Sequence, residues 1–357
     1  GGNAAECPHS MFVNDNDELY VFGTTGSPNF PVTIQAYDNS FNGGSSITVN
    51  SSVAYPYGSD IFITKFSADG DSLRASTFIG GSSNDGLNTG QPLKKNYADE
   101  SRGEIIVDGQ SNVYVVSCTF SDDFPTTTGS FQPTYNGGKD GCVLKLDQNL
   151  SHLIWSSYFG GSGNEACYSM DLASDNSIYL CGGTTTTDLS TSTSAAQSAY
   201  GGGSCDGFVA HISENGDQLL QCSYLGKSDY DQCYLLKLNR SNHPYLFGQT
   251  SAAGNAWWVN TLYGQPGGGQ FLTHLTPNLD SIIWSTAYGT GNEQRPDISP
   301  TALLVDLCNT VYMSGWGSRQ LNGFGGTQGL PVTADAFQTT TDGRGYYFIC
   351  LREGGTT

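Results

Sequence analysis

Internal repetition constrains the fold of this 357-residue chain more than any other feature. One signature consists of an aromatic residue, two mostly apolar residues and a small residue. Its five copies begin at Tyr20, Tyr114, Tyr179, Tyr245 and Tyr312. The last four copies follow one another at intervals of 65, 66 and 67 residues, whereas the first interval is 94 residues. The longer interval predicts insertions in the first repeat.

Two further signatures follow each copy of the first. One is a strand-length segment rich in β-formers, found at residues 60–66, 140–146, 206–212, 270–275 and 346–351. The other ends in an aromatic residue and small residues, mostly glycine, and is found at residues 73–81, 153–161, 219–227 and 282–290. A short apolar segment and a turn of Asp, Asn, Ser or Gly precede the first signature. Each repeat therefore predicts four antiparallel strands.

Four-stranded repeats of this length are typical of propeller blades, which bury their two apolar faces against neighbouring blades. Rungs of a β-solenoid are much shorter, and immunoglobulin-like domains need roughly 100 residues each. We predict an all-β fold, a single β-propeller over residues 1–357 with about five four-stranded antiparallel blades. The blades are expected at residues 8–81, 103–161, 167–227, 233–290 and 301–357, the last without its fourth strand. We expect this chain to be part of a larger propeller.

The signatures resemble the SBBP β-propeller repeat family. The loop of that family, with the pattern F-P-T-T-x-G-x-F-Q, is matched at residues 124–132, more loosely at 330–338, and in part at 29–33. Residues 188–190 and 251–270 depart from the pattern. The resemblance implies a large cell-surface protein of Bacteroidota, secreted by the type 9 system and associated with gliding motility and adhesion. It also implies an extracellular or cell-surface location and further domains of the same parent chain as partners.

The formal net charge is −19, with 14 Lys and Arg residues against 33 Asp and Glu. Such an acidic surface repels phosphate backbones, so no nucleic-acid partner is expected. No apolar run approaches the roughly 20 residues that span a bilayer, so no membrane insertion is expected either. Ten cysteines occur without a C-x-x-C pair, which leaves open whether they form disulfides or remain buried thiols.

Recognisable catalytic patterns are missing from the sequence. It contains neither G-x-S-x-G nor H-E-x-x-H, so we predict no catalytic residues and no enzymatic activity. His211 and His274 share one repeat position and could form a metal pair, although lightly exposed strand residues are the favoured interpretation. Asn14, Asp15, Asn16 and Asp17 are weak candidates for a Ca²⁺ site, because they lack the glycine and closing glutamate of a calcium loop. The alternative for them is a hairpin turn.

Aromatic residues could form a platform for sugar rings. Trp257, Trp258 and Tyr263 lie in the fourth repeat, where the family loop is missing, and Trp316 lies in a glycine-rich stretch. These four are our ligand-binding candidates, and the alternative is packing on a blade edge. Two insertions, residues 39–58 and 84–102, are further candidates for contact surfaces or solvated loops. The second contains Lys94 and Lys95, a rare basic spot.

Three hypotheses of function follow. The first is a non-enzymatic extracellular structural or adhesive module, whose rim loops bind a glycan or a cell-surface or other extracellular protein. The second is a carbohydrate-active or other hydrolytic propeller. The third is a subunit of an extracellular filament or surface appendage, in which another chain supplies the missing outer strand of the last repeat.

Overall fold

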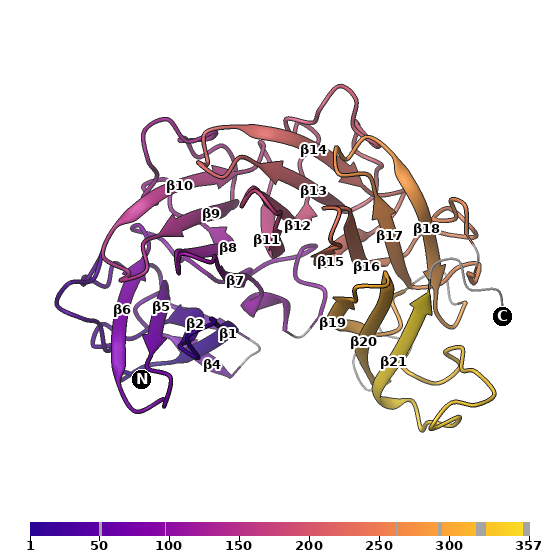
Figure 1. The fold of residues 1–357 in the computed structure, drawn as a ribbon, viewed down its shortest axis with the longest axis horizontal. Coiled ribbons are helices and arrows are strands. Elements are labelled where there is room, and N and C mark those ends of the chain that lie inside the picture. Colours follow the sequence, from indigo (N-terminus) through magenta and orange to yellow (C-terminus); the bar gives the residue numbers. More distant parts are fainter. Residues whose placement is uncertain (50–51, 97, 262, 292–294, 319–325, 353–357) are drawn as a thin grey trace. The chain divides into compact units, whose positions relative to one another are not determined.

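The computed structural model describes the chain apart from residues 50–51, 97, 262, 292–294, 319–325 and 353–357 (Figure 1). The regular elements of the described residues are strands, joined by turns and loops, and the only helical element among them is one 3-10 turn, η1 (Asp99–Ser101). Within the described part, no helix is long and apolar enough to cross a membrane. The fold is an all-β propeller of antiparallel blades, which confirms the predicted fold class.

Each repeat forms its own sheet, and the sheets are called blades one to five in chain order. Blade one contains β1 (Glu6–Val13), β2 (Leu19–Thr25), β5 (Asp60–Phe66) and β6 (Leu73–Ile79); blade two contains β7 (Glu104–Val107), β8 (Val113–Thr119), β9 (Asp140–Leu146) and β10 (Leu153–Phe159). Blade three contains β11 (Glu165–Leu172), β12 (Ile178–Thr184), β13 (Asp206–Ile212) and β14 (Leu219–Leu225); blade four contains β15 (Asp231–Leu238), β16 (Pro244–Thr250), β17 (Gln270–Leu275) and β18 (Ile282–Tyr288). Blade five has three described strands, β19 (Ser299–Val305), β20 (Thr310–Ser318) and β21 (Arg344–Arg352), and the first insertion adds the small hairpin of β3 (Ile47–Val49) and β4 (Val53–Tyr55).

The chain divides into two compact units. Unit 1 consists of residues 1–180, 184–189 and 211–220, and unit 2 consists of residues 181–183, 190–210 and 221–357. The division runs through blade three, so each unit is described by itself. That residues 1–357 form a single domain stays a prediction.

Alternation of side chains along the strands builds the core of unit 1. Tyr20 and Phe22 of β2, with Ile63 of β5, lie in one buried cluster with Val113 and Val115 of β8. Blade one therefore covers blade two with side chains from alternate positions. The same arrangement recurs in unit 2, where one cluster joins side chains of blades four and five.

The hairpin turn between the first two strands of a blade uses the same chemistry in most repeats. The Asp108 carboxylate accepts hydrogen bonds from the backbone N–H groups of Gln110 and Asn112, at 2.9 and 2.8 Å. The fourth residue of the turn has a positive φ, from 59° to 65°, at Asp17, Ser111, Asn176, Asn242 and Asn309. Asn and Asp tolerate this left-handed conformation better than other non-glycine residues, and they occupy four of these five positions, with Ser111 the exception.

Candidate functional site

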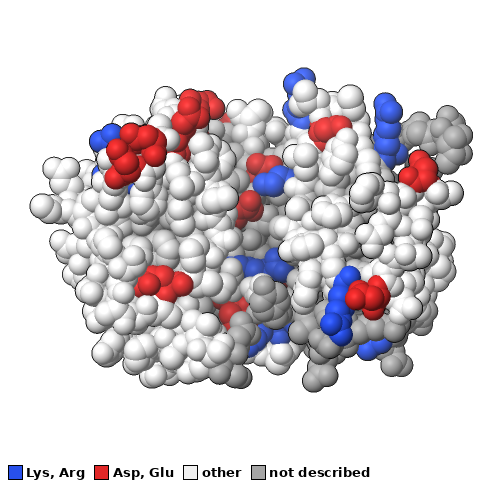
Figure 2. Space-filling model, turned by 90° about the horizontal axis from the view of Figure 1, so that it is seen from below, with Lys and Arg blue, Asp and Glu red and all other residues white. Residues whose placement is uncertain are grey.

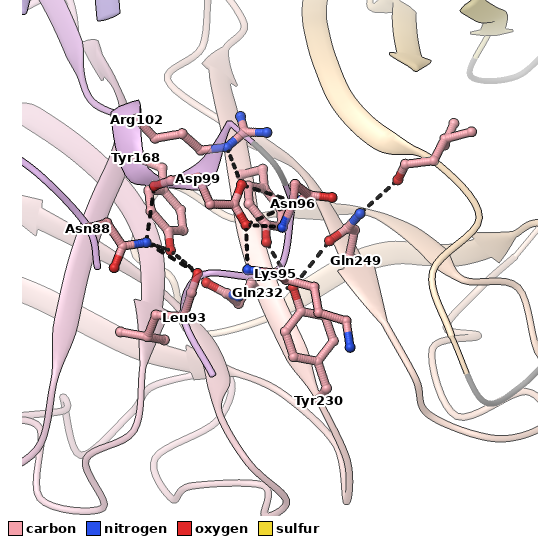
Figure 3. Close-up of polar contacts among 12 residues, drawn as sticks. Asn88, Leu93, Lys95, Asn96, Asp99, Arg102, Tyr168, Tyr230, Gln232 and Gln249 are labelled. Carbon is pink, nitrogen blue, oxygen red and sulfur yellow. Dashed lines mark hydrogen bonds and ion pairs between the residues drawn. The ribbon is translucent and has the colours of Figure 1, made fainter. Parts of the chain in front are cut away.

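The longest connection between described blades lies in unit 1 and provides the candidate site. Residues 80–103 join β6 to β7, whereas residues 160–164 suffice between β10 and β11, and residues 226–230 between β14 and β15. The long connection contains the predicted insertion 84–102 and ends in η1. Figure 3 shows its side chains beside Tyr168 of β11.

Asn88 holds the insertion to the neighbouring strands. Its amide nitrogen lies 3.2 Å from the Leu93 carbonyl oxygen, 3.1 Å from the Asp99 carbonyl oxygen and 3.0 Å from the Tyr168 hydroxyl. The Tyr168 hydroxyl in turn donates to the Leu93 carbonyl at 2.9 Å. The Lys139 ammonium donates to the Asn88 side-chain oxygen. All of these groups are buried, so a missing partner would leave a desolvated polar atom, and the loop conformation is fixed accordingly.

Asp99 organises the end of the insertion. Its carboxylate accepts hydrogen bonds from the backbone N–H groups of Lys95, at 2.8 Å, and Asn96, at 2.6 Å, and from the Asn96 amide at 3.1 Å. It also pairs with the Arg102 guanidinium, whose Nε lies 2.7 Å away. Figure 3 shows these donors converging on one carboxylate. A carboxylate with this many donors is preorganised and acts as a scaffold for the residues around it.

In the insertion, the acidic side chains of Asp99 and Glu100 are buried, and the basic side chains are more exposed. The carboxylates of Asp99 and Glu100 have exposed fractions of 0% and 1%, whereas Arg102 is 14% exposed and Lys94, the ion-pair partner of Glu100, is 30% exposed. Lys95 is also partly exposed. The surface of the segment is therefore more basic than its composition suggests. On the face in Figure 2, charged side chains are spread in small groups among uncharged ones.

Glu104, at the start of β7, follows the insertion and is only partly buried. It accepts hydrogen bonds from the Ser169 hydroxyl at 2.5 Å and from the Met170 N–H at 2.9 Å, both on β11. These contacts fix one side of the carboxylate next to the segment that carries Arg102. The position is suitable for proton transfer, for which a carboxylate must be both oriented and accessible.

Buried carboxylates recur at the junctions between blades, and their repetition indicates a structural role. Asp85 and Glu165 in unit 1 each accept the N–H of a preceding glycine, Gly81 at 2.8 Å and Gly161 at 3.0 Å. Burial raises the pKa of Asp85 well above its usual range and that of Glu165 to about 7. In unit 2, burial raises the pKa of Asp231 to about 7 and also raises that of Asp297.

A second carboxylate begins the third strand of the first three blades. The Asp60 carboxylate accepts the Gly43 N–H at 2.8 Å, and the Asp140 carboxylate accepts the Asn136 N–H at 3.0 Å. Burial raises the pKa of both Asp60 and Asp140 to about 6, and that of Asp206 to about 7. These acids are inaccessible to a polymer, so their raised pKa values do not mark a catalytic pair.

Unit 2 contains a second polar cluster, composed of uncharged groups. The Tyr230 hydroxyl lies 2.8 Å from the Tyr234 hydroxyl, 2.9 Å from the Gln232 amide nitrogen and 3.1 Å from the Gln249 side-chain oxygen. Gln249 donates to the Ile298 carbonyl at 2.7 Å. All of these side chains are buried, and Gln270 stands where the first three blades have aspartate. This cluster joins blades four and five and is part of the packing of unit 2.

Two of the four predicted aromatic ligand residues differ sharply in exposure. Trp257 is 3% exposed; its ring stacks on Phe271 at 3.8 Å and its indole N–H donates to the Thr250 hydroxyl at 2.9 Å. The Trp257 ring therefore has almost no free surface on which a sugar could stack. Tyr263 is 40% exposed and remains available to a ligand.

The other two predicted aromatic residues, Trp258 and Trp316, are half-buried. Trp316 pairs with Ser299 on one side and with Tyr346 on the other, in the middle of the sheet of blade five. The structure does not gather all four residues into one platform, and ligand binding by Trp258, Tyr263 or Trp316 stays a prediction.

The weak calcium candidates form the first hairpin turn. The Asn14 side-chain oxygen accepts the N–H groups of Asn16, at 3.0 Å, and Glu18, at 2.9 Å, as Asp108 does in blade two. Asp15, Asn16 and Asp17 are exposed. The oxygen of Asn14 thus stabilises the turn itself, and among the described residues no group of three or more His, Cys, Asp or Glu side chains could hold a metal.

The two histidines of one repeat position pack on tyrosines. His211 stacks on Tyr179 at 4.0 Å, and His274 stacks on Tyr245 at 4.1 Å. Lys65 and Lys145 occupy the same position in blades one and two, over the rings of Tyr20 and Tyr114. His274 is only 4% exposed, so the expectation of a lightly exposed residue is wrong for it. In these four blades, the residue at this repeat position is a Lys or His side chain that packs on the face of a tyrosine ring.

All ten cysteines are free thiols in the structure. Seven of them are buried, one is half-buried, and Cys308 and Cys350 are exposed. The spacing of the cysteines in the sequence did not decide between disulfides and buried thiols. In the structure, the seven buried cysteines are thiols in the core.

Sequence reasoning missed most of the candidate site. Lys94 and Lys95 were noticed as a basic spot, but Asn88, Asp99 and Glu104 were not singled out. Their only signal is their position in or beside an insertion that interrupts a regular repeat, because each type of residue is also common in ordinary turns.

Comparison with known proteins shows no family for this chain. No family model matches the chain, and no curated protein matches it either. The chain has a similar fold to a protein of unknown function from Dyadobacter fermentans, at 10% identity and a TM-score of 0.44, covering 87% of this chain and 71% of the other. It is also similar to the NanB sialidase of Streptococcus pneumoniae, at 10% identity and a TM-score of 0.43, covering 88% of this chain and 53% of the sialidase.

A third similar structure is an ulvan lyase of polysaccharide lyase family PL25, at 10% identity and a TM-score of 0.45, covering 91% of this chain and 69% of the lyase. The chain spans about half the length of the sialidase. These findings correct the prediction that the chain is not an enzyme, because sialidases and a polysaccharide lyase are enzymes among the proteins of similar fold. The missing sequence motifs are therefore no ground for excluding catalysis.

Proposed function

We propose that this chain is a carbohydrate-active propeller that takes an acidic polysaccharide at the 84–102 insertion of unit 1. The observation that carries the proposal is the sorting of charge in this segment. Asp99 and Glu100 are buried, whereas Lys94, Lys95 and Arg102 reach the surface. The proposal keeps the extracellular or cell-surface location that the SBBP resemblance implies.

An acidic polysaccharide suits this surface for electrostatic reasons. Uronate carboxylates and sulfate esters accept charge-assisted hydrogen bonds from ammonium and guanidinium groups. The rest of the protein, with a formal net charge of −19, repels a polyanion. Binding would therefore be local, and it would weaken as salt screens the charges.

The rigid frame of the insertion supports catalysis as well as binding. Asn88, Asp99 and Tyr168 hold the basic residues on a fixed backbone, which lowers the entropy lost on binding. Cleavage of a glycosidic bond needs a group that transfers a proton at the sugar. We assign Glu104 as the candidate for this proton transfer, because its carboxylate is oriented by Ser169 and Met170 and is only partly buried.

The test compares neutral, uronate-containing and sulfated polysaccharides. Binding is measured by titration calorimetry at low and high salt, and cleavage by the appearance of new reducing ends. We expect binding of an acidic polysaccharide that weakens at least tenfold in Lys95→Glu. The matched control is Arg74→Glu, which makes the same charge change at an exposed position of β6 in the same unit.

The role of Glu104 is tested by Glu104→Gln, which keeps an oxygen for the Ser169 and Met170 hydrogen bonds. We expect this variant to bind the polysaccharide as the wild type does and to lose at least 100-fold in cleavage rate. Equal binding of neutral and acidic polysaccharides, or equal losses in Lys95→Glu and Arg74→Glu, would overturn the proposed site. Binding without cleavage by the wild type would overturn the proposed activity.

A further inference from the structure

Blade four brings two histidines into direct contact. The Nε2 atom of His274, next to last in β17, lies 3.2 Å from the Nδ1 atom of His243, which directly precedes β16. The ring centroids are 5.3 Å apart and the ring planes are tilted by 53°, so the imidazoles meet through their nitrogen edges rather than their faces. Both residues belong to unit 2, and we call them the histidine pair.

The same two positions meet in other blades, with different side chains. In blade one the Lys65 ammonium lies 2.9 Å from the Glu18 carboxylate. In blade three the His211 Nε2 atom lies 2.8 Å from the Ser177 hydroxyl. Each contact joins the residue directly before the second strand to the next-to-last residue of the third strand. The blade therefore holds these positions within contact distance for several kinds of side chain, and among these three blades only blade four has an imidazole at both.

The rest of blade four fixes both rings of the pair. The His274 ring stacks on Tyr245 at 4.1 Å and meets the edge of Trp284 at 5.8 Å. The His243 backbone N–H donates to the Asn239 side-chain oxygen at 3.0 Å, and the His243 carbonyl accepts the Asn239 N–H at 3.1 Å. Because the rings are already held in place, a ligand shared by the two nitrogens costs little conformational entropy.

The distance between the two nitrogens suits a shared metal ion. Zinc binds an imidazole nitrogen at about 2.0–2.1 Å, which places two nitrogens of a tetrahedral site ~3.4 Å apart. The observed distance of 3.2 Å is close to this value. Imidazole nitrogens favour Zn²⁺, Cu²⁺ and Ni²⁺, whereas Mg²⁺ and Ca²⁺ prefer oxygen ligands. His243 is half-buried and Ser241 of the same turn is exposed, so water can reach the pair and supply further ligands.

We propose that the histidine pair binds one divalent transition-metal ion of the Zn²⁺ or Cu²⁺ class. The two protein ligands are the Nε2 atom of His274 and the Nδ1 atom of His243. Each imidazole keeps its proton on the other ring nitrogen, so replacing the hydrogen bond by a metal ion needs only a change of tautomer at the donor histidine. No third His, Cys, Asp or Glu side chain of the described residues joins the pair, so water completes the coordination. This site does not depend on the polysaccharide site proposed in unit 1.

The first test is calorimetric titration with zinc chloride, after alkylation of the accessible thiols and with excess Mg²⁺ to occupy carboxylate oxygens. The main variant is His243→Ser, which recreates the contact between Ser177 and His211 and so keeps a hydrogen bond for His274. The matched control is His152→Ser, at an exposed position in unit 1. We expect the wild type to bind Zn²⁺, with an affinity at least tenfold lower in His243→Ser and unchanged in His152→Ser.

The second test builds the pair in another blade. Ser177→His places a second imidazole beside His211, whose ring stacks on Tyr179 at 4.0 Å with the same ring angle, 14°, as the stacked histidine of blade four. We expect this variant to bind one Zn²⁺ more than the wild type. Circular dichroism and the melting temperature show whether each variant keeps the fold. Electron paramagnetic resonance of bound Cu²⁺ should show nitrogen ligands in the wild type that are lost in His243→Ser.

A wild type that binds Zn²⁺ no more tightly than His243→Ser would overturn the proposal. Equal losses in His243→Ser and His152→Ser would do the same, because scattered surface groups would then hold the ion. A folded Ser177→His variant that gains no site would also contradict the proposal, since the shared geometry of the two positions is its basis.

Discussion

A pair of side chains in neighbouring blades of unit 1 gives the sharpest prediction about packing. Trp155 of β10 is 4% exposed, and its indole N–H donates to the Glu214 carbonyl at 2.9 Å. It fills the space over Gly216, a turn residue of blade three with a φ of 66°. A Cβ added to Gly216 would lie 2.3 Å from the Trp155 ring. The contact between blades one and two has the opposite sizes. The small Ala75 stands at the position of Trp155, the large Leu150 stands at the position of Gly216, and the two lie in one cluster.

Gly216→Leu should therefore destabilise the protein by about 2–5 kcal/mol, from overpacking against Trp155 and from a left-handed conformation. Trp155→Ala should cost about 3–5 kcal/mol, because it leaves a cavity and removes the bond to Glu214. Together the two changes recreate the Ala75 and Leu150 arrangement, in which Leu150 adopts a φ of 53° and is fully buried. We expect the double variant to be more stable than the sum of the single changes predicts, by about 2 kcal/mol.

The assay is urea unfolding followed by circular dichroism for the wild type, the two single variants and the double variant. The four free energies form a double-mutant cycle. A coupling energy below about 0.5 kcal/mol, the usual error for independent sites, would refute the size-exchange reasoning.

Two further predictions concern titration and thiol reactivity. Burial raises the pKa of the repeated carboxylates to about 6–7, above the value of about 4 in an unfolded chain, so the folded state binds more protons. This contribution to the free energy of unfolding is fully present below pH 4 and is lost as pH rises through 6–7. The melting temperature should therefore fall between pH 5 and pH 8. A melting temperature that rises over that range would contradict the raised pKa values of these carboxylates. In a thiol titration of the native protein, we expect the half-buried Cys7 and the exposed Cys308 and Cys350 to react quickly, and the remaining cysteines only after unfolding. Unfolding in denaturant without a reductant should release all ten thiols, and a smaller number would indicate disulfides.

The repeats could be predicted from the sequence because short-range sequence patterns specify them. Asn or Asp in a tight turn, such as Asp108 and Asn242, and a short apolar run rich in β-formers, such as that of β8, act within a few positions of one another. Their recurrence at 65–67 residues was enough to identify blades. The candidate site was harder to predict from the sequence, because it lies in an insertion that interrupts the repeat pattern.

The sequence by itself determined the all-β propeller, the strand segments of each blade and the turns that join them, because short-range backbone preference and recurring runs of β-forming residues specify them. Only the tertiary structure decided which side chains are buried and which are exposed to water. It buried Trp257 against Phe271, turned the carboxylates of Asp99 and Glu100 inward, and matched Trp155 with Gly216. Burial and charge at these positions depend on partners in other strands or loops, and a local pattern contains no information about which distant residue will cover it.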